Sequence, residues 1–218
     1  SQAYLFSMAS LVTRFHLLLF AVMLATTGVA LVRVPVDFTY VAHWSGGRAD
    51  WLWPRELALS IAPVLALALL LLFFLIGRLF TKNQFAKSQH ILDPALTLLL
   101  AVIAATQLGL LMAGIGSDLD VIRLTGFGLG VFMLGLGIVL FEAERHTYAG
   151  LRMPWPIVSE AAWRLVHRST GVTTFLAGAG LLALAWFDAG MGVLIIAFVV
   201  SMVFPGLVAG LTSLVDRA

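Results

Sequence analysis

The sequence contains no cysteine and few charged residues, and both shortages restrict what kind of protein it can form. Because there is no cysteine among the 218 residues, a disulfide framework, a thiolate metal site and a thiol nucleophile are excluded. Charged residues make up 11% of the chain, compared with roughly 25% in an ordinary soluble domain. Hydrophobic residues make up 61%, which leaves too little polar surface to enclose a water-soluble core. The composition therefore indicates an integral membrane protein.

Long polar blocks are also missing, and apolar runs recur along the whole chain. A helix needs about 20 apolar residues to cross the hydrocarbon layer, where it satisfies its own backbone hydrogen bonds. Six stretches meet this requirement, namely residues 8–32, 57–79, 94–115, 124–141, 170–186 and 191–214. We therefore predict an all-α, polytopic membrane protein with six transmembrane helices in a single membrane domain over residues 1–218. Residues 1–93 would supply the first two helices and residues 94–218 the other four.

Ionisable side chains are nearly absent from these spans. His16 lies near the start of the first span, and the polar residues Thr106 and Gln107 lie in the middle of the third. Charges inside a membrane usually mark ion pathways or proton relays, so their scarcity disfavours an ion-coupled transporter. We expect these three side chains to form hydrogen bonds between helices.

Basic residues are unevenly divided between the two sets of loops. Nine lie on the side of the termini: Arg14, Arg78, Lys82, Lys87, Arg145, Arg152, Arg164, Arg168 and Arg217. Only Arg33, Arg48, Arg55 and Arg123 lie on the other side. Because lysine and arginine concentrate in short cytoplasmic loops, we predict that both termini are cytoplasmic and that the loop at 33–56 is extracytoplasmic. The basic residues form no contiguous patch, so no nucleic-acid partner is predicted.

Small residues recur at a spacing that allows helices to approach closely. The pairs are Gly126 with Gly130 and Gly206 with Gly210, and Gly137 adds to the first pair. Such pairs usually serve packing within a bundle, and they can also form the contact face of a homo-oligomer.

The first long loop, residues 33–56, is rich in tryptophan, with Trp44, Trp51 and Trp53 close to a pair of glycines. Tryptophan prefers the membrane interface, so the loop could be an anchoring turn on the outer leaflet. Alternatively, the loop could form a folded binding surface.

In that second interpretation, His43 and Asp50 flank the turn at Gly46 and Gly47 and could pair with each other or hold a ligand. A metal site built from Asp37, His43 and Asp50 is conceivable, but the spacing is not diagnostic of one. We predict no metal and no cofactor.

The second long loop, residues 142–168, contains Pro154 and Pro156 on either side of Trp155. Proline restricts its own backbone and that of the residue before it, so residues 150–156 should be extended and fixed.

A separate short helix is predicted from about residue 157 to residue 168. Glu160 and Arg164 lie four residues apart in the favourable order, and Trp163 and His167 form a parallel stripe. Such a helix suits the cytoplasmic surface of the bilayer, with the tryptophan at headgroup depth.

Recognisable catalytic motifs are missing: the sequence has no Gly-x-Ser-x-Gly elbow, no His-Glu-x-x-His pair and no phosphate loop. We therefore predict a protein that is not an enzyme. The alternative is a membrane enzyme or lipid-handling protein in which arginines of the second loop bind phosphate headgroups and His167 acts as acid or base.

Two segments together resemble a known family. The second loop reads Gly150-Leu-Arg152-Met-Pro154-Trp155, then Ser159-Glu160, then Trp163-Arg164-Leu-Val-His167-Arg168. The first loop contains His43-Trp44 followed by Gly47 and Asp50, with Ser45 where asparagine is usual. These segments resemble the SdpI family of bacterial membrane proteins and its companion domain of unknown function. The family consists of six-helix proteins typified by an immunity protein against a secreted killing peptide.

The resemblance implies immunity to, or sensing of, a secreted toxic peptide at the bacterial cytoplasmic (inner) membrane. The partners it implies are membrane lipid, the peptide and a cytoplasmic regulator. The residues it singles out for binding a ligand or partner are His43, Trp44, Gly47, Asp50, Gly150, Arg152, Pro154, Trp155, Trp163, Arg164 and His167.

Overall fold

The computed structural model describes residues 10–145, 150–151, 155–157 and 159–215. Within them it contains six long helices and one hairpin of two strands. The helices are α1 (Arg14–Arg33), α2 (Arg55–Leu79), α3 (Lys82–Gly114), α4 (Val121–Glu142), α5 (Glu160–Trp186) and α6 (Met191–Val215). The strands β1 (Thr39–Ser45) and β2 (Arg48–Pro54) lie between α1 and α2. All six helices are long and apolar enough to span a membrane, which confirms the predicted six-helix fold.

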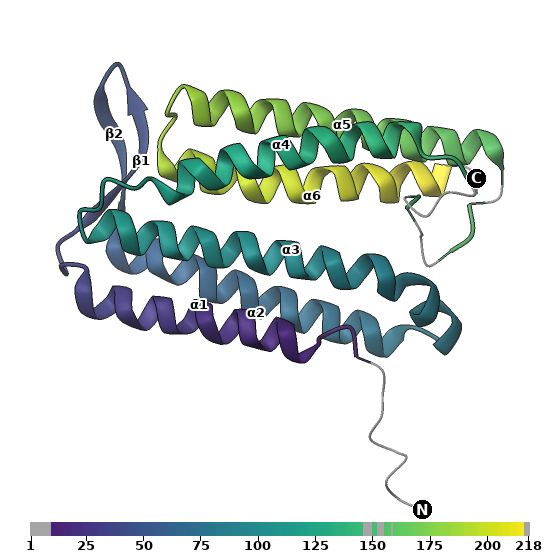
Figure 1. The fold of residues 1–218 in the computed structure, drawn as a ribbon, viewed down its shortest axis with the longest axis horizontal. Helices are drawn as coiled ribbons and strands as arrows, with labels where there is room; N and C mark the ends of the chain where they lie inside the picture. The colour runs from purple at the N-terminus through teal and green to yellow at the C-terminus, as the bar shows by residue number, and fades with distance from the viewer. Residues whose placement is uncertain (1–9, 146–149, 152–154, 158, 216–218) are drawn as a thin grey trace, which may run out of the picture.

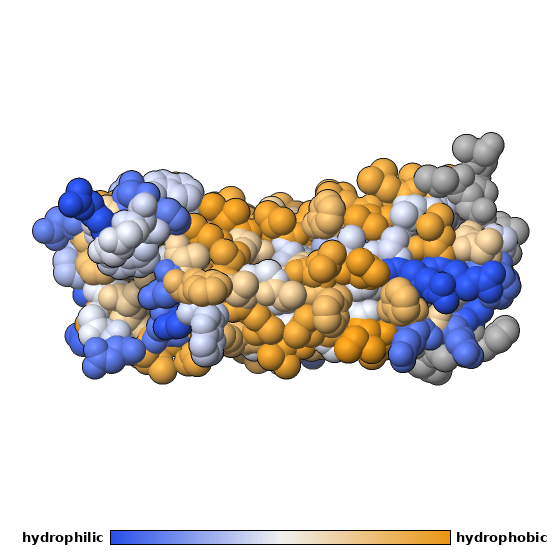
Figure 2. All heavy atoms as spheres, turned by 90° about the horizontal axis from the view of Figure 1, so that it is seen from above, coloured by the Kyte–Doolittle hydropathy of each residue, from blue (hydrophilic) through white to orange (hydrophobic). Residues whose placement is uncertain are grey.

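The helices form two groups of three, α1–α3 and α4–α6, which lie side by side (Figure 1). The hairpin projects from one end of the bundle, which we call the hairpin end. On the face shown in Figure 2, apolar side chains cover the middle of the surface, and hydrophilic ones lie at both ends. Large apolar residues such as Val64, Val131 and Leu176 are more than 60% exposed, as expected for side chains that face lipid. The protein is therefore a multi-pass membrane protein.

Helices α1, α3 and α5 begin well away from their predicted starts. Helix α1 begins at Arg14 and α3 at Lys82, and each is preceded by a threonine that forms a capping box, Thr13 with His16 and Thr81 with Gln84. Hydropathy predicts that a helix starts where the apolar run starts. In α1 and α3 the capping box sets the start of the helix, and it lies in polar sequence.

The predicted separate helix at residues 157–168 is wrong, because α5 runs without a break from Glu160 to Trp186. The side chain of Ser159 accepts a hydrogen bond from the amide of Ala162 and caps the start of this single helix. No proline lies between Pro156 and the end of α5 at Trp186, so the short polar helix continues into the membrane span.

Helices α4 and α5 are in direct backbone contact at two glycine pairs. A β-carbon at Gly137 would lie 2.6 Å from the amide nitrogen of Phe175, and one at Gly171 would lie 2.7 Å from the carbonyl oxygen of Gly137. Seven residues away along each helix, Gly130 and Gly178 face each other in the same way. The expectation of tight internal packing is confirmed for Gly130 and Gly137, whereas their partners Gly171 and Gly178 on α5 were not predicted.

Other glycines face away from the bundle. A β-carbon at Gly135, Gly206 or Gly210 would meet no heavy atom within 4 Å. Association of two copies through this open surface of α4 or α6 stays a prediction.

Two of the three polar side chains predicted to link helices do so. The Nε2 atom of His16 lies 2.9 Å from the hydroxyl of Thr97, and the amide of Gln107 donates to the hydroxyl of Thr27 and the carbonyl of Leu59. The hydroxyl of Thr106 instead donates to a carbonyl of its own helix, so that prediction was wrong. A threonine in a helix satisfies its hydroxyl locally whenever the carbonyl four residues earlier is in reach.

Candidate functional site

The tryptophan-rich loop folds into an antiparallel hairpin whose turn is formed by Gly46 and Gly47. Both glycines have positive φ values, 56° and 78°, as a two-residue hairpin turn of type I′ requires. Across the strands, Nδ1 of His43 lies 2.6 Å from a carboxylate oxygen of Asp50. The predicted pairing of these two residues is confirmed, whereas the strands themselves were not predicted.

The metal hypothesis fails on geometry. Among the described residues no group of three or more histidine, aspartate or glutamate side chains comes together, so Asp37 does not join His43 and Asp50. The imidazole and the carboxylate that could hold a ligand are already bonded to each other.

The base of the hairpin packs against the start of α6. Ala42 is fully buried against Gly190 and Gly192, and a β-carbon at Gly190 would lie 2.6 Å from the carbonyl oxygen of Ala42. Gly190 also has a φ of 103°, which other residues rarely adopt. Sequence reasoning missed this contact, and the only signal was the pair of glycines at the start of the sixth span.

Two buried polar side chains fix the hairpin to the first three helices. The hydroxyl of Tyr40 donates to the carbonyl of Leu110 at 2.9 Å. The guanidinium of Arg55 donates to the carbonyl of Val34 at 2.8 Å, just beyond the end of α1. Burial raises the pKa of Tyr40 to about 12, and the positive charge of Arg55 opposes this increase. The hairpin therefore has a rigid base.

Tyr40 should make the protein less stable at high pH. Its hydroxyl has a pKa near 10 in the unfolded chain and about 12 in the folded protein, so folding retains a proton that the unfolded chain releases. The stability from this group is complete below about pH 10 and is lost as the pH rises to about 12. Between about pH 10 and pH 12, the unfolding temperature should fall more steeply with rising pH for the natural protein than for Tyr40→Phe. Equal declines in the two proteins would contradict the assignment.

The tip of the hairpin presents an exposed aromatic surface. Trp44 and Trp51 are 41% and 44% exposed, and Leu52 is 49% exposed. Trp53 is buried and meets the ring of Trp51 edge-on, with ring centroids 5.5 Å apart. One tryptophan thus anchors the hairpin while the other two are available for contact with a membrane surface or with a partner.

At the opposite end of the bundle, Trp163 and His167 are buried and stacked, with ring centroids 3.9 Å apart. The indole of Trp163 donates to the carbonyl of Ala143. His167 accepts from the amide of Leu151 at its Nε2 atom, and its Nδ1 atom faces the carbonyl of Trp163 at 2.9 Å. This pattern assigns the neutral ring with its proton on Nδ1. Both ring nitrogens are thus occupied by backbone groups.

Further residues that were predicted to bind a ligand or partner lie in the same region. Gly150 lies against the ring of Trp163, and a β-carbon at Gly150 would lie 2.5 Å from that ring. The indole of Trp155 donates a hydrogen bond to the hydroxyl of Ser213 on α6. Arg164 is exposed and lines a cavity of about 500 Å³. Arg152 and Pro154 lie outside the described residues, and so does part of the segment predicted to be extended.

The cavity beside Arg164 carries balanced charge. Its lining includes the arginines Arg145, Arg164 and Arg168 and the glutamates Glu142, Glu144 and Glu160. Arg145 already forms an ion pair with Glu160 at 3.2 Å. Among the described residues, a phosphate group entering this cavity would meet as many carboxylates as guanidinium groups, which does not favour a dedicated phosphate site.

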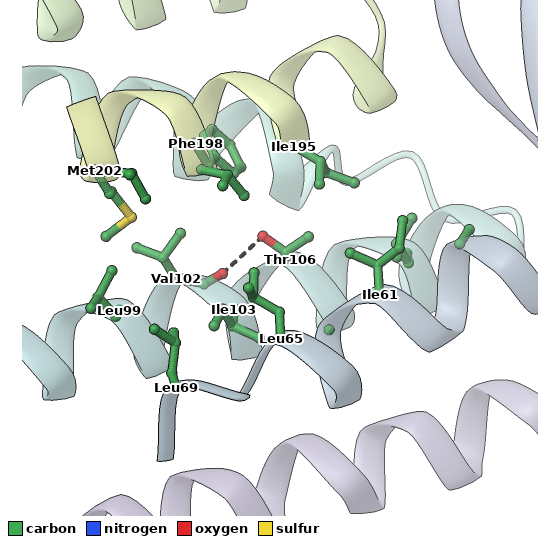
Figure 3. A pocket seen from close by; sticks show the side chains of 15 residues that line it. Ile61, Leu65, Leu69, Leu99, Val102, Ile103, Thr106, Ile195, Phe198 and Met202 are labelled. Atoms are coloured by element: carbon green, nitrogen blue, oxygen red, sulfur yellow. Dashed lines mark hydrogen bonds between the residues drawn. The ribbon is translucent and has the colours of Figure 1, made fainter. Parts of the chain in front are cut away.

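A narrow apolar groove of about 70 Å³ lies between the two groups of helices, with walls from α2, α3 and α6 (Figure 3). Thr106 is the one polar residue in its lining, and its hydroxyl is bonded to the carbonyl of Val102. The groove therefore offers no free polar anchor for a solute and suits hydrocarbon. A transport pathway for polar solutes finds no support there.

The residues named by the sequence thus form two sets, at opposite ends of the bundle. His43, Trp44, Gly47 and Asp50 lie on the hairpin, and Gly150, Trp155, Trp163, Arg164 and His167 lie around the start of α5.

Comparisons with known proteins point to one family. The model of the SdpI/YfhL protein family matches residues 142–210, which cover the second loop, α5 and most of α6. The Immunity protein SdpI of Bacillus subtilis (strain 168) is 27% identical over 145 residues, a match covering 66% of this chain and 68% of that relative. No solved structure matches the chain significantly. The resemblance inferred from the two loops is confirmed by the family model and this relative.

Proposed function

We propose that this chain, which is similar to the SdpI family over residues 142–210 and 27% identical to an immunity protein of that family, is itself an immunity protein of the bacterial inner membrane that protects cells from a secreted toxic peptide. The similarity to an immunity protein over two thirds of both chains supports the role. The exposed aromatic surface on a rigid hairpin supports a contact with the peptide. Binding there would capture the peptide before it reaches its target.

The hairpin is the best candidate for the encounter because of its position and its rigidity. The division of basic residues between the two ends predicts that the hairpin lies outside the cytoplasm, where a secreted peptide arrives. Tryptophan carries much of the free energy in protein interfaces because it is large and loses little entropy on binding. Trp44 and Trp51 would supply such contacts without rearrangement of the loop.

The opposite end, around Trp163 and His167, would contact a cytoplasmic regulator and so report that the peptide has bound. Its exposed Arg164 and Arg168 would also lie near the membrane lipid headgroups. We propose that the protein acts without catalysis. The two nitrogens of His167 already face backbone groups, so this residue is poorly placed to act as an acid or a base.

Replacing Trp44 should weaken protection without removing the protein from the membrane. Sensitive bacteria that express the chain would be challenged with the secreted killing peptide that typifies the family's immunity role. For Trp44→Ala, the peptide concentration that halves growth should fall about tenfold, corresponding to about 1.4 kcal/mol of binding free energy.

Trp186 provides the matched control, because it is 70% exposed at the same end of the bundle but lies on α5. Trp186→Ala should leave protection unchanged. Equal loss of protection in the two variants, or a loss that only follows reduced abundance on an immunoblot, would refute a specific contact at Trp44.

A further inference from the structure

A second cavity lies at the hairpin end, between the hairpin and the ends of α3, α4 and α6. Its volume is about 280 Å³, slightly below the roughly 300–1,000 Å³ of pockets that hold whole small molecules. Its walls include the aromatic side chains Phe38 and Trp44 and the thioether of Met191. The cavity is therefore suited to one long side chain of a partner.

Two carboxylates, Asp120 and Asp188, line this cavity, and none of its lining residues is basic. Asp120 precedes α4 and accepts a hydrogen bond from the amide of Arg123 through one carboxylate oxygen. Asp188 lies in the turn between α5 and α6. The two acids thus reach the cavity from separate turns, and Trp44 reaches it from the hairpin.

Nearby cations are engaged elsewhere. The guanidinium of Arg123 donates to the carbonyls of Ala185 and Trp186, at the end of α5, with distances of 2.6 and 3.0 Å. The guanidinium of Arg55 is bonded in the same way to carbonyls at the end of α1. These arginines stabilise helix ends, where the helix dipole is negative.

The hairpin end as a whole carries excess negative charge. Its loops and adjoining helix ends contain six acidic residues, namely Asp37, Asp50, Glu56, Asp118, Asp120 and Asp188, against four arginines, Arg33, Arg48, Arg55 and Arg123. A surface with one dominant sign of charge raises the local concentration of opposite charges and speeds their association. A cationic partner is therefore favoured at this end.

We propose that this cavity binds a lysine or arginine side chain of the secreted peptide, between the carboxylates of Asp120 and Asp188 and the indole of Trp44. The carboxylates would attract the cation and accept its hydrogen bonds. The face of Trp44 would add a cation–π contact, and the apolar wall would cover the alkyl stem. This inference rests on the proposed immunity function and identifies the chemical group that the site would recognise.

The test uses the full chain in lipid nanodiscs with 5-fluorotryptophan in place of tryptophan, so that ¹⁹F NMR reports on each indole. The resonance of Trp44 is assigned from its absence in Trp44→Phe. The probes are N-acetyl-lysine methylamide and its neutral counterpart N-acetyl-norleucine methylamide. The lysine probe should shift the Trp44 resonance, the norleucine probe should not, and added salt should weaken the response.

Asp120→Asn and Asp188→Asn remove charge while keeping the local backbone. Asparagine caps a helix as well as aspartate does, and it tolerates the φ of 51° found at Asp188. Each change should weaken lysine binding about two- to fivefold, as expected for exposed ion pairs, and the double variant should weaken it about 4- to 25-fold. Asp118→Asn is the matched control, because Asp118 lies in the same turn as Asp120 but does not line the cavity.

The outcomes separate this site from the immunity function. Equal shifts with lysine and norleucine, or full lysine binding by the double variant, overturn the cation site. If lysine binds as expected but the double variant still protects cells fully, the cavity does not recognise the toxic peptide and this proposal fails. If the chain gives no protection at all, the immunity function fails, whatever the NMR result.

Discussion

Leucine in place of Gly137 should prevent α4 and α5 from packing and should cost at least about 3 kcal/mol of folding stability. The reason is that a β-carbon at this position would lie 2.6 to 2.8 Å from backbone atoms of Phe175 and Gly171, which cannot move aside as a side chain can. Separating the two helices would also open the neighbouring contact between Gly130 and Gly178. The change is measured as the unfolding temperature of the purified protein in detergent, followed by circular dichroism.

Gly135 is the matched control, on the same helix and two residues away. A β-carbon there would meet nothing within 4 Å, so Gly135→Leu adds a side chain that points to lipid or detergent. Leucine also has the higher helix propensity, so the control should be neutral or slightly stabilising. If both variants unfold at the same temperature, the close backbone contact of α4 with α5 does not exist in the membrane.

Removing the indole of Trp163 should be about as damaging as Gly137→Leu. This side chain is 5% exposed, is stacked on His167 and donates to the carbonyl of Ala143. Trp163→Ala should cost about 3–5 kcal/mol, as for large buried aromatic residues, and it would also leave that carbonyl without its donor. The same detergent unfolding experiment measures the loss.

Trp186→Ala, at the other end of the same helix, removes an indole that is 70% exposed. It should change the unfolding free energy by no more than about 0.5 kcal/mol. Trp163→Phe adds a graded test, because it retains a stacked ring but loses the indole N–H. An unfolding temperature for Trp163→Ala equal to that of Trp186→Ala would show that the stacked pair contributes nothing.

The transmembrane spans could be predicted because apolar length alone determines them. Where the helix ends depend on capping by polar residues, as at Thr81 and Ser159, hydropathy placed them several residues too late. The separate surface helix at 157–168 was wrong for this reason, since a polar turn and an apolar span can belong to one helix. Hydropathy identifies the residues that can lie in the lipid. A helix extends beyond them for as long as its backbone hydrogen bonds continue.

The candidate sites were partly predictable. The pairing of His43 with Asp50 followed from residues on either side of a glycine turn, which is a local relationship in the sequence. The cavity bounded by Trp44, Asp120 and Asp188 was not predictable, because its walls come from the hairpin and two turns far apart in the chain. Charges in separate loops give no periodic signal, and only the folded bundle brings them to one place.

The way in which the hairpin is seated has a consequence for biosynthesis. Within each group of three helices, contacts join segments that are close in sequence, so each group can pack while the ribosome is still adding later residues. The contact of Ala42 with Gly190 and Gly192 is different, because about 150 residues separate the partners. The hairpin can bond to α3 through Tyr40 early, but it acquires its contact with α6 only after α6 has been synthesised. A nascent chain that stalls before α6 would therefore present its exposed tryptophans on a hairpin that is supported by the first three helices alone.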